Sequence, residues 1–157
     1  MLRRRTPLGT PHLSPEVVAK LSEMAQAALP LETGGILLGW YEHHDIRITD
    51  AIAVEDLAAT ATSYSRGNEA GNAALGAYMK GQPAGSPLGY VGEWHSHPGP
   101  AGPSPLDTLS FIGITESAKQ PLVQVVMALQ GNEWRPVVCM SRSRLSLARW
   151  PSSMVRL

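Results

Sequence analysis

The stretch that organises this chain reads Gly92-Glu93-Trp94-His95-Ser96-His97-Pro98. Successive side chains of a β-strand point to opposite faces, so His95 and His97 share one face, about 6.5–7 Å apart along the backbone. Pro98 ends the strand, because proline has no amide hydrogen for the ladder and restricts the residue before it. Two imidazoles side by side at the end of a strand indicate a metal site.

A third ligand is expected at the end of the Gly/Pro-rich loop that follows, in the motif Ser104-x-x-Asp107. Ser104-Pro105 is typical of a helix start, with serine as the N-cap and proline at the first helical position. Asp107 then lies in the first helical turn, where its carboxylate can reach the histidines. Two neutral histidines and one acid, with an open position, are the usual ligands of a catalytic zinc ion.

Helices and strands alternate along the rest of the chain. Ser14-Pro15 repeats the serine–proline helix start, and apolar residues at helical spacing follow it as far as residue 28. Further helices are expected over residues 68–80 and after Ser104. Strands are expected over residues 34–41, 46–52, 88–95, 121–129, 134–140 and 145–150, with Gly131-Asn132 as a hairpin turn.

This order predicts one α/β domain over residues 14–157, with a central mixed sheet flanked by helices in three layers. Residues 34–39 are apolar throughout, as in a strand that is buried on both faces. Residues 1–13 contain several prolines and glycines and no apolar period, so they are expected to form a flexible N-terminal tail. Residues 53–66 are expected to be irregular.

Composition and charge exclude several classes of function. The 157 residues contain 13 basic and 13 acidic side chains, which gives no basis for binding nucleic acid. No apolar run reaches the roughly 18 residues of a membrane span, and no signal-peptide core follows Arg3-Arg4-Arg5, so a cytoplasmic protein is expected. The single Cys139 lies in an apolar run and is interpreted as a buried core residue. The oligomeric state is left open.

A hydrolytic metal site also needs a general base and a donor for the oxyanion. Glu32 immediately precedes the apolar strand, where partial desolvation raises the pKa of a carboxyl group toward the range useful for a base. His43 and His44 are less suitable as ligands, because neighbouring residues of a strand face opposite ways and a polar turn explains them.

Two blocks of the sequence resemble the JAMM motif of the MPN-domain zinc metallopeptidases, and of their bacterial members in particular. The blocks are Glu32-Thr33-Gly34-Gly35-Ile36-Leu37-Leu38-Gly39 and His95-Ser96-His97-Pro98 with Ser104-x-x-Asp107. The resemblance implies a cytidine-deaminase-like α/β fold, with zinc held by His95, His97 and Asp107. It also implies that Glu32 is the general base acting through zinc-bound water, and that Ser104 helps to stabilise the tetrahedral intermediate.

The chain departs from that motif in the loop before the aspartate. Nine residues lie between His97 and Asp107, one fewer than is usual, whereas the spacing from Ser104 to Asp107 is intact. Shortening a surface loop has a small energetic cost, so the change is expected to affect loop geometry more than ligation.

The resemblance implies a zinc-dependent isopeptidase or peptidase that hydrolyses the bond at the C-terminus of a ubiquitin-like protein or a related bacterial conjugate. Ubiquitin-activating-like and conjugating-like enzymes are then candidate partners. The alternatives are a non-catalytic binding scaffold of the same fold and a processing peptidase of a sulfur-carrier protein. The five intact motif positions favour the enzyme, because non-catalytic members of the family usually lack ligands.

Overall fold

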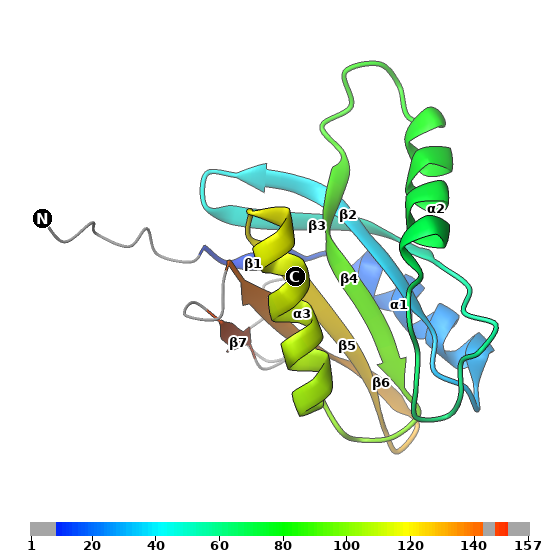
Figure 1. Ribbon diagram of the computed structural model, residues 1–157. Helices are drawn as coiled ribbons and strands as arrows, with labels where there is room; N and C mark the ends of the chain where they lie inside the picture. Colours follow the sequence, from blue (N-terminus) through cyan, green and yellow to red (C-terminus); the bar gives the residue numbers. More distant parts are fainter. Residues whose placement is uncertain (1–8, 143–146, 151–157) are drawn as a thin grey trace, which may run out of the picture.

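A curled seven-stranded sheet forms the centre of the computed structural model, which describes residues 9–142 and 147–150 (Figure 1). The strands are β1 (Pro11–Leu13), β2 (Gly34–Glu42), β3 (Asp45–Ala53), β4 (Gly89–His97), β5 (Leu122–Gln130), β6 (Glu133–Ser141) and β7 (Ala148–Trp150). Their order across the sheet is β1-β3-β2-β4-β5-β6-β7. The pairs β1–β3 and β4–β5 are parallel and the other neighbours are antiparallel, so the predicted mixed sheet is confirmed.

Three helices connect these strands, namely α1 (Pro15–Ala28), α2 (Asn68–Lys80) and α3 (Pro105–Ala118). Helices α1 and α2 begin and end close to the positions predicted from the sequence, and α3 begins where it was predicted. Both α1 and α3 start as expected, with a serine N-cap followed by proline. No helix of the described residues is long and apolar enough to cross a membrane.

The helices cover both faces of the sheet. On one face α1 packs through Val17 and Leu21 into a cluster that includes Leu37. On the other face Ile36 contacts the apolar side of α2, and a third cluster joins Phe111 of α3 to the sheet. Adjacent residues of β2 thus point to opposite layers, as strand geometry requires. The predicted three-layer α/β arrangement is confirmed, and Gly34 to Gly39 are buried on both sides.

The prediction of a flexible tail over residues 1–13 is wrong for its last part. Pro11–Leu13 form β1, which pairs in parallel with the edge of β3, and Leu13 is fully buried. Asp45 fixes this pairing, because it accepts hydrogen bonds from the Thr10 backbone (2.8 Å) and lies 2.9 Å from His12 Nε2. The partners of β1 are residues of β3, more than thirty positions away in the sequence. No local sequence pattern indicates this pairing. Residues 1–8 lie outside the described part of the chain.

The remaining segments largely agree with the predictions made from the sequence. Residues after Ala53 are irregular as far as α2, apart from an isolated bridge between Thr60 and Ser63. His43 and His44 lie in the turn between β2 and β3. The last expected strand is present as β7, paired with β6, whereas residues 143–146 lie outside the described residues.

Gly92 allows β4 to lie close to β5. A Cβ atom at this position would lie only 1.8 Å from the carbonyl oxygen of Val123. We therefore expect Gly92→Ala to lower the free energy of unfolding by about 1–3 kcal/mol, the usual cost of overpacking. Gly89→Ala, in the same strand but with open space around the added carbon, is the control. Urea denaturation measures both variants, and equal stability would contradict the close approach.

Candidate metal centre

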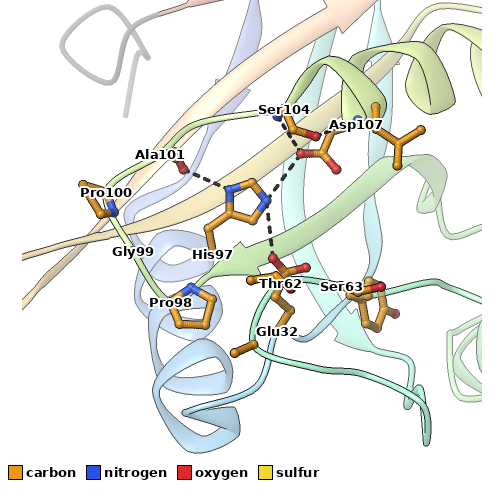
Figure 2. A pocket seen from close by; sticks show the side chains of 13 residues that line it. Glu32, Thr62, Ser63, His97, Pro98, Gly99, Pro100, Ala101, Ser104 and Asp107 are labelled. Carbon is orange, nitrogen blue, oxygen red and sulfur yellow. Dashed lines mark hydrogen bonds and ion pairs between the residues drawn. The ribbon is translucent and has the colours of Figure 1, made fainter.

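A cleft of about 420 Å³ opens where β4 ends (Figure 2). Its polar floor is formed by Glu32 before β2, His97 at the end of β4, and Ser104 and Asp107 at the start of α3. Its walls are the segments 61–64 and 98–101. The predicted ligands and the predicted base therefore lie in or beside one cleft, and His95 lines a neighbouring cavity that shares Asp107 with it.

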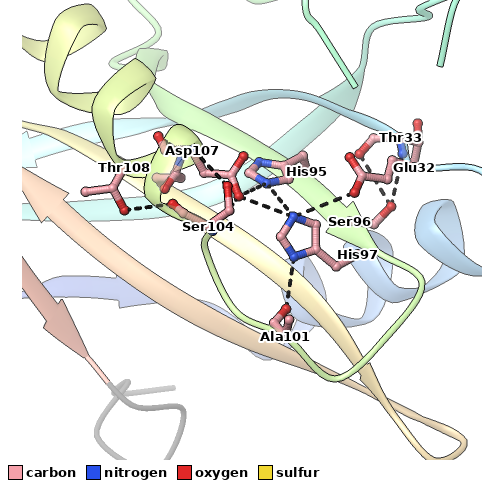
Figure 3. Close-up of polar contacts among 10 residues, drawn as sticks. Glu32, Thr33, His95, Ser96, His97, Ala101, Ser104, Asp107 and Thr108 are labelled. Atoms are coloured by element: carbon pink, nitrogen blue, oxygen red, sulfur yellow. Dashed lines mark hydrogen bonds and ion pairs between the residues drawn. The ribbon is translucent and has the colours of Figure 1, made fainter. Parts of the chain in front are cut away.

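The two histidines point together, as the strand alternation predicts. Their Nε2 atoms are 3.1 Å apart, and the two ring centroids are separated by 4.9 Å (Figure 3). The Nδ1 atom of His97 lies 2.9 Å from the backbone carbonyl of Ala101. A carbonyl accepts only from a protonated nitrogen, so this contact places the hydrogen on Nδ1 and leaves the Nε2 lone pair free.

Asp107 is held by the helix start itself. The Ser104 hydroxyl accepts a hydrogen bond from the Asp107 backbone (3.0 Å), and the Ser104 backbone donates to Asp107 Oδ2 (2.7 Å). This reciprocal capping box places Oδ2 at 3.5 Å from His95 Nε2 and 3.4 Å from His97 Nε2. Burial acts to raise the pKa of Asp107, but hydrogen bonds from His95 and Ser104 hold it well below its usual range. The carboxylate is therefore ionised, as a metal ligand must be.

The separations of the three ligand atoms fit a small metal ion. Four ligands placed tetrahedrally around zinc at its usual bond lengths lie about 3.3–3.4 Å from one another. The corresponding distances among His95 Nε2, His97 Nε2 and Asp107 Oδ2 are 3.1, 3.4 and 3.5 Å. This group could hold a metal ion and leave a fourth position open.

Glu32 lies beside this group, in the segment that joins α1 to β2. Its Oε1 atom is 3.8 Å from His97 Nε2, and its side chain is only 9% exposed. Burial raises the pKa of Glu32 above its ordinary value, and the charges of His97 and His95 oppose this shift. The direction expected from the sequence is confirmed.

The family of the chain follows from comparison with known proteins. The model of the prokaryotic homologs of the JAB domain matches residues 14–142. The chain belongs to this family. Comparison with curated proteins finds no match. Among solved structures, protein DSY2949 from Desulfitobacterium hafniense is similar, with a TM-score of 0.68 and 19% identity over 90% of each chain. Identity this low shows a shared fold and nothing about activity.

Pairing of β2 with β4 brings together the two sequence blocks that carry Glu32 and the histidines of this JAB domain. Gly34 lies opposite His95 in the antiparallel ladder. Ser96, on the face opposite to the two histidines, is fully buried, and its hydroxyl accepts a hydrogen bond from the Thr33 backbone (3.0 Å). The Ser96 backbone in turn donates to the Thr33 carbonyl (2.8 Å). Ser96 therefore fixes the segment that carries Glu32, a role that the sequence did not predict.

The irregular segment before α2 also contributes to the JAB-domain cleft. Thr62, Ser63 and Tyr64 line it, and the Thr60 carbonyl accepts a hydrogen bond from the Glu32 backbone (2.8 Å). Sequence analysis assigned no role to these residues, because they show neither a motif nor a period. Their position depends on long-range contacts alone.

The raised pKa of Glu32 leads to a pH-dependent stability prediction. Well below the ordinary pKa of 4.5, the carboxyl group is protonated in both the folded and the unfolded protein. Its burial then has little effect on the free energy of unfolding. Near pH 7 the folded state must keep a desolvated carboxylate that the unfolded state solvates freely. We expect Glu32→Gln to stabilise the metal-free protein near pH 7 and to be nearly neutral near pH 4. Denaturant titrations at both pH values test this, and a destabilised variant at pH 7 would mean that the histidines stabilise the charge.

Proposed function

We propose that this JAB-domain protein is a zinc-dependent isopeptidase or peptidase, which hydrolyses the bond at the C-terminus of a ubiquitin-like protein or a related bacterial conjugate. The observation that carries the proposal is a desolvated carboxylate, Glu32, beside three ligand atoms at tetrahedral spacing. His95, His97 and Asp107 would hold zinc, since two imidazoles and one carboxylate suit this ion. When bound there, zinc would polarise the scissile carbonyl and lower the pKa of water.

The residues of the chain would then move the protons. Glu32 takes a proton from the attacking water as the oxygen of that water bonds to the carbonyl carbon. It gives a proton to the leaving nitrogen as the carbon–nitrogen bond breaks, so the products are a carboxylate and an amine. A pKa raised by burial suits a group that must accept a proton and then release it near neutral pH.

The size of the cleft supports a tail as the substrate. A volume of about 420 Å³ lies in the range of small-molecule sites and is too small for a folded domain. The cleft lies between the segments 61–64 and 98–101, so an extended chain can pass between them (Figure 2). The exposed C-terminal tail of a ubiquitin-like protein has the required form.

The test is cleavage by purified zinc-loaded protein of ubiquitin-like proteins fused through their C-terminal tails to a reporter. Sulfur-carrier proteins that carry one added amino acid form a second set of substrates. We expect cleavage at the end of the tail in one of the two sets, and none when zinc is removed by a chelator. Tail binding without cleavage by the zinc-loaded protein would favour a non-catalytic scaffold.

Ser104 is expected to act on the oxyanion in addition to capping α3. Its hydroxyl lines the cleft, where it would turn its hydrogen from the Asp107 carboxylate toward the oxyanion. Ser104→Ala should lower kcat by about 10²–10³, the usual loss for one oxyanion donor. Ser14→Ala is the matched control, since Ser14 caps α1 in the same way and lies outside the cleft.

Both serine variants should lose similar stability, about 0.5–2 kcal/mol for a lost N-cap. Steady-state kinetics and thermal denaturation of the two variants separate the roles. Equal activity of Ser104→Ala and Ser14→Ala would restrict Ser104 to capping the helix.

A further inference from the structure

A second cavity lies on the other side of the metal group. It has a volume of about 220 Å³ and is lined by His95, Asp107 and Gln124, among other residues. The larger cleft is instead lined by His97 and Glu32, and Asp107 borders both spaces. The second cavity is thus next to the ligands but outside the cleft proposed for the substrate.

Gln124 is the polar exception in a buried strand. Seven consecutive residues of β5, Leu122 to Ala128, are buried, and the other six are apolar. The Gln124 amide nitrogen donates a long hydrogen bond, 3.5 Å, to the backbone carbonyl of Asp107. Its Oε1 atom is buried and is without a hydrogen-bond partner among the described residues. Burying an unpaired acceptor is unfavourable, so this oxygen requires a donor.

The ring of His95 has an N–H group that needs an acceptor when the other ring nitrogen binds a metal. Its Nε2 atom faces His97 and Asp107, so ligation through Nε2 requires the hydrogen to be on Nδ1. His97 meets this requirement through Ala101. Within the described residues no equivalent protein acceptor is found for His95 Nδ1. Metal-binding histidines almost always donate their second ring hydrogen to a carboxylate, a carbonyl or a water molecule.

Glu93 also lines this cavity, and one of its carboxylate oxygens is engaged. Glu93 Oε1 accepts from Arg66 at 2.6 and 2.9 Å and from the Tyr90 hydroxyl at 3.0 Å. Gln124 Oε1 is the acceptor that lacks a donor. A cavity of about 220 Å³ has room for ordered water, whose share of liquid volume is about 30 Å³ per molecule.

We propose that Gln124 is a positioning residue for the metal site. When Nε2 of His95 binds the metal, a water molecule in the second cavity accepts from His95 Nδ1 and donates to Gln124 Oε1. The amide nitrogen of the same side chain holds the backbone of Asp107. Gln124 thereby orients two ligands at once. This inference rests on the metal site of the proposed function, and its test measures metal affinity and not activity.

The test compares Gln124→Leu, which removes both the acceptor and the amide donor, with Gln124→Glu, which keeps an acceptor and removes the donor to Asp107. Zinc affinity of each purified variant is measured by competition with a chromogenic chelator. Thr115→Val is the control, because Thr115 is a buried polar residue of α3 whose hydroxyl donates to Phe111.

We expect wild type and Thr115→Val to bind zinc with equal affinity, and Gln124→Leu to bind it about 10–100-fold more weakly. Gln124→Glu should lie between them, because it keeps an acceptor for the cavity water and loses the donor to Asp107. Unchanged zinc affinity of Gln124→Leu, or equal losses in Gln124→Leu and Gln124→Glu, would overturn the proposal while the proposed function stands. A wild type that binds no zinc would instead overturn the proposed function.

Discussion

His97→Ala and Asp107→Asn are each expected to abolish tight zinc binding. The wild-type protein should bind about one zinc ion per chain, held by three protein ligands. Loss of an outer partner of a ligand already weakens binding about 10–100-fold, so loss of a ligand should weaken it by more. Asparagine at position 107 keeps an oxygen that can accept from the Ser104 backbone, so the capping of α3 should be retained.

The matched control for the ligand variants is His44→Ala. His44 lies in the turn between β2 and β3 and outside the metal group. Elemental analysis after dialysis should find zinc in wild type and in His44→Ala, and only traces in the ligand variants. A wild-type protein that neither carries zinc nor takes it up when zinc is added would rule out the site.

Glu32→Gln is expected to keep zinc and to lose cleavage. Glutamine preserves the shape of the side chain but cannot accept the proton of the attacking water, and loss of a general base typically lowers the rate by about 10²–10⁴. The ligands are unchanged, so the zinc content should remain that of wild type. Binding of the substrate tail should also survive, because the cleft walls are intact, and the variant should retain conjugates that wild type cleaves.

Glu23→Gln is the control for the loss of a carboxylate, since Glu23 is exposed on α1. Rate measurements at saturating zinc compare the two variants with wild type. Full activity of Glu32→Gln would exclude Glu32 as the base.

Local signals predicted most of the site. Strand alternation placed His95 and His97 on one face, and the Ser104-Pro105 helix start placed Asp107 in a first turn. The shorter loop did not disturb this geometry, because the capping box that orients the Asp107 carboxylate is formed within four residues. Such local features can be predicted without knowledge of the tertiary structure.

Features that depend on distant partners were not predicted. Strand β1 exists because the edge of β3 accepts it, and Ser96 acts through Thr33, a residue 63 positions away. Gln124 did leave a signal, a single polar residue within an apolar strand run, but its significance appears only when Asp107 and the second cavity are placed beside it.

The most direct test of the proposed hydrolase is cleavage of the ubiquitin-like and sulfur-carrier substrates in ¹⁸O-labelled water, followed by mass spectrometry. Zinc-loaded wild type should release the tail with one ¹⁸O atom in its new carboxylate, because hydrolysis transfers the oxygen of water to the carbonyl carbon. Glu32→Gln with the same zinc content should release almost none. Zinc-loaded wild type that leaves every substrate intact, or a Glu32→Gln variant that cleaves as fast as wild type, would contradict the assignment.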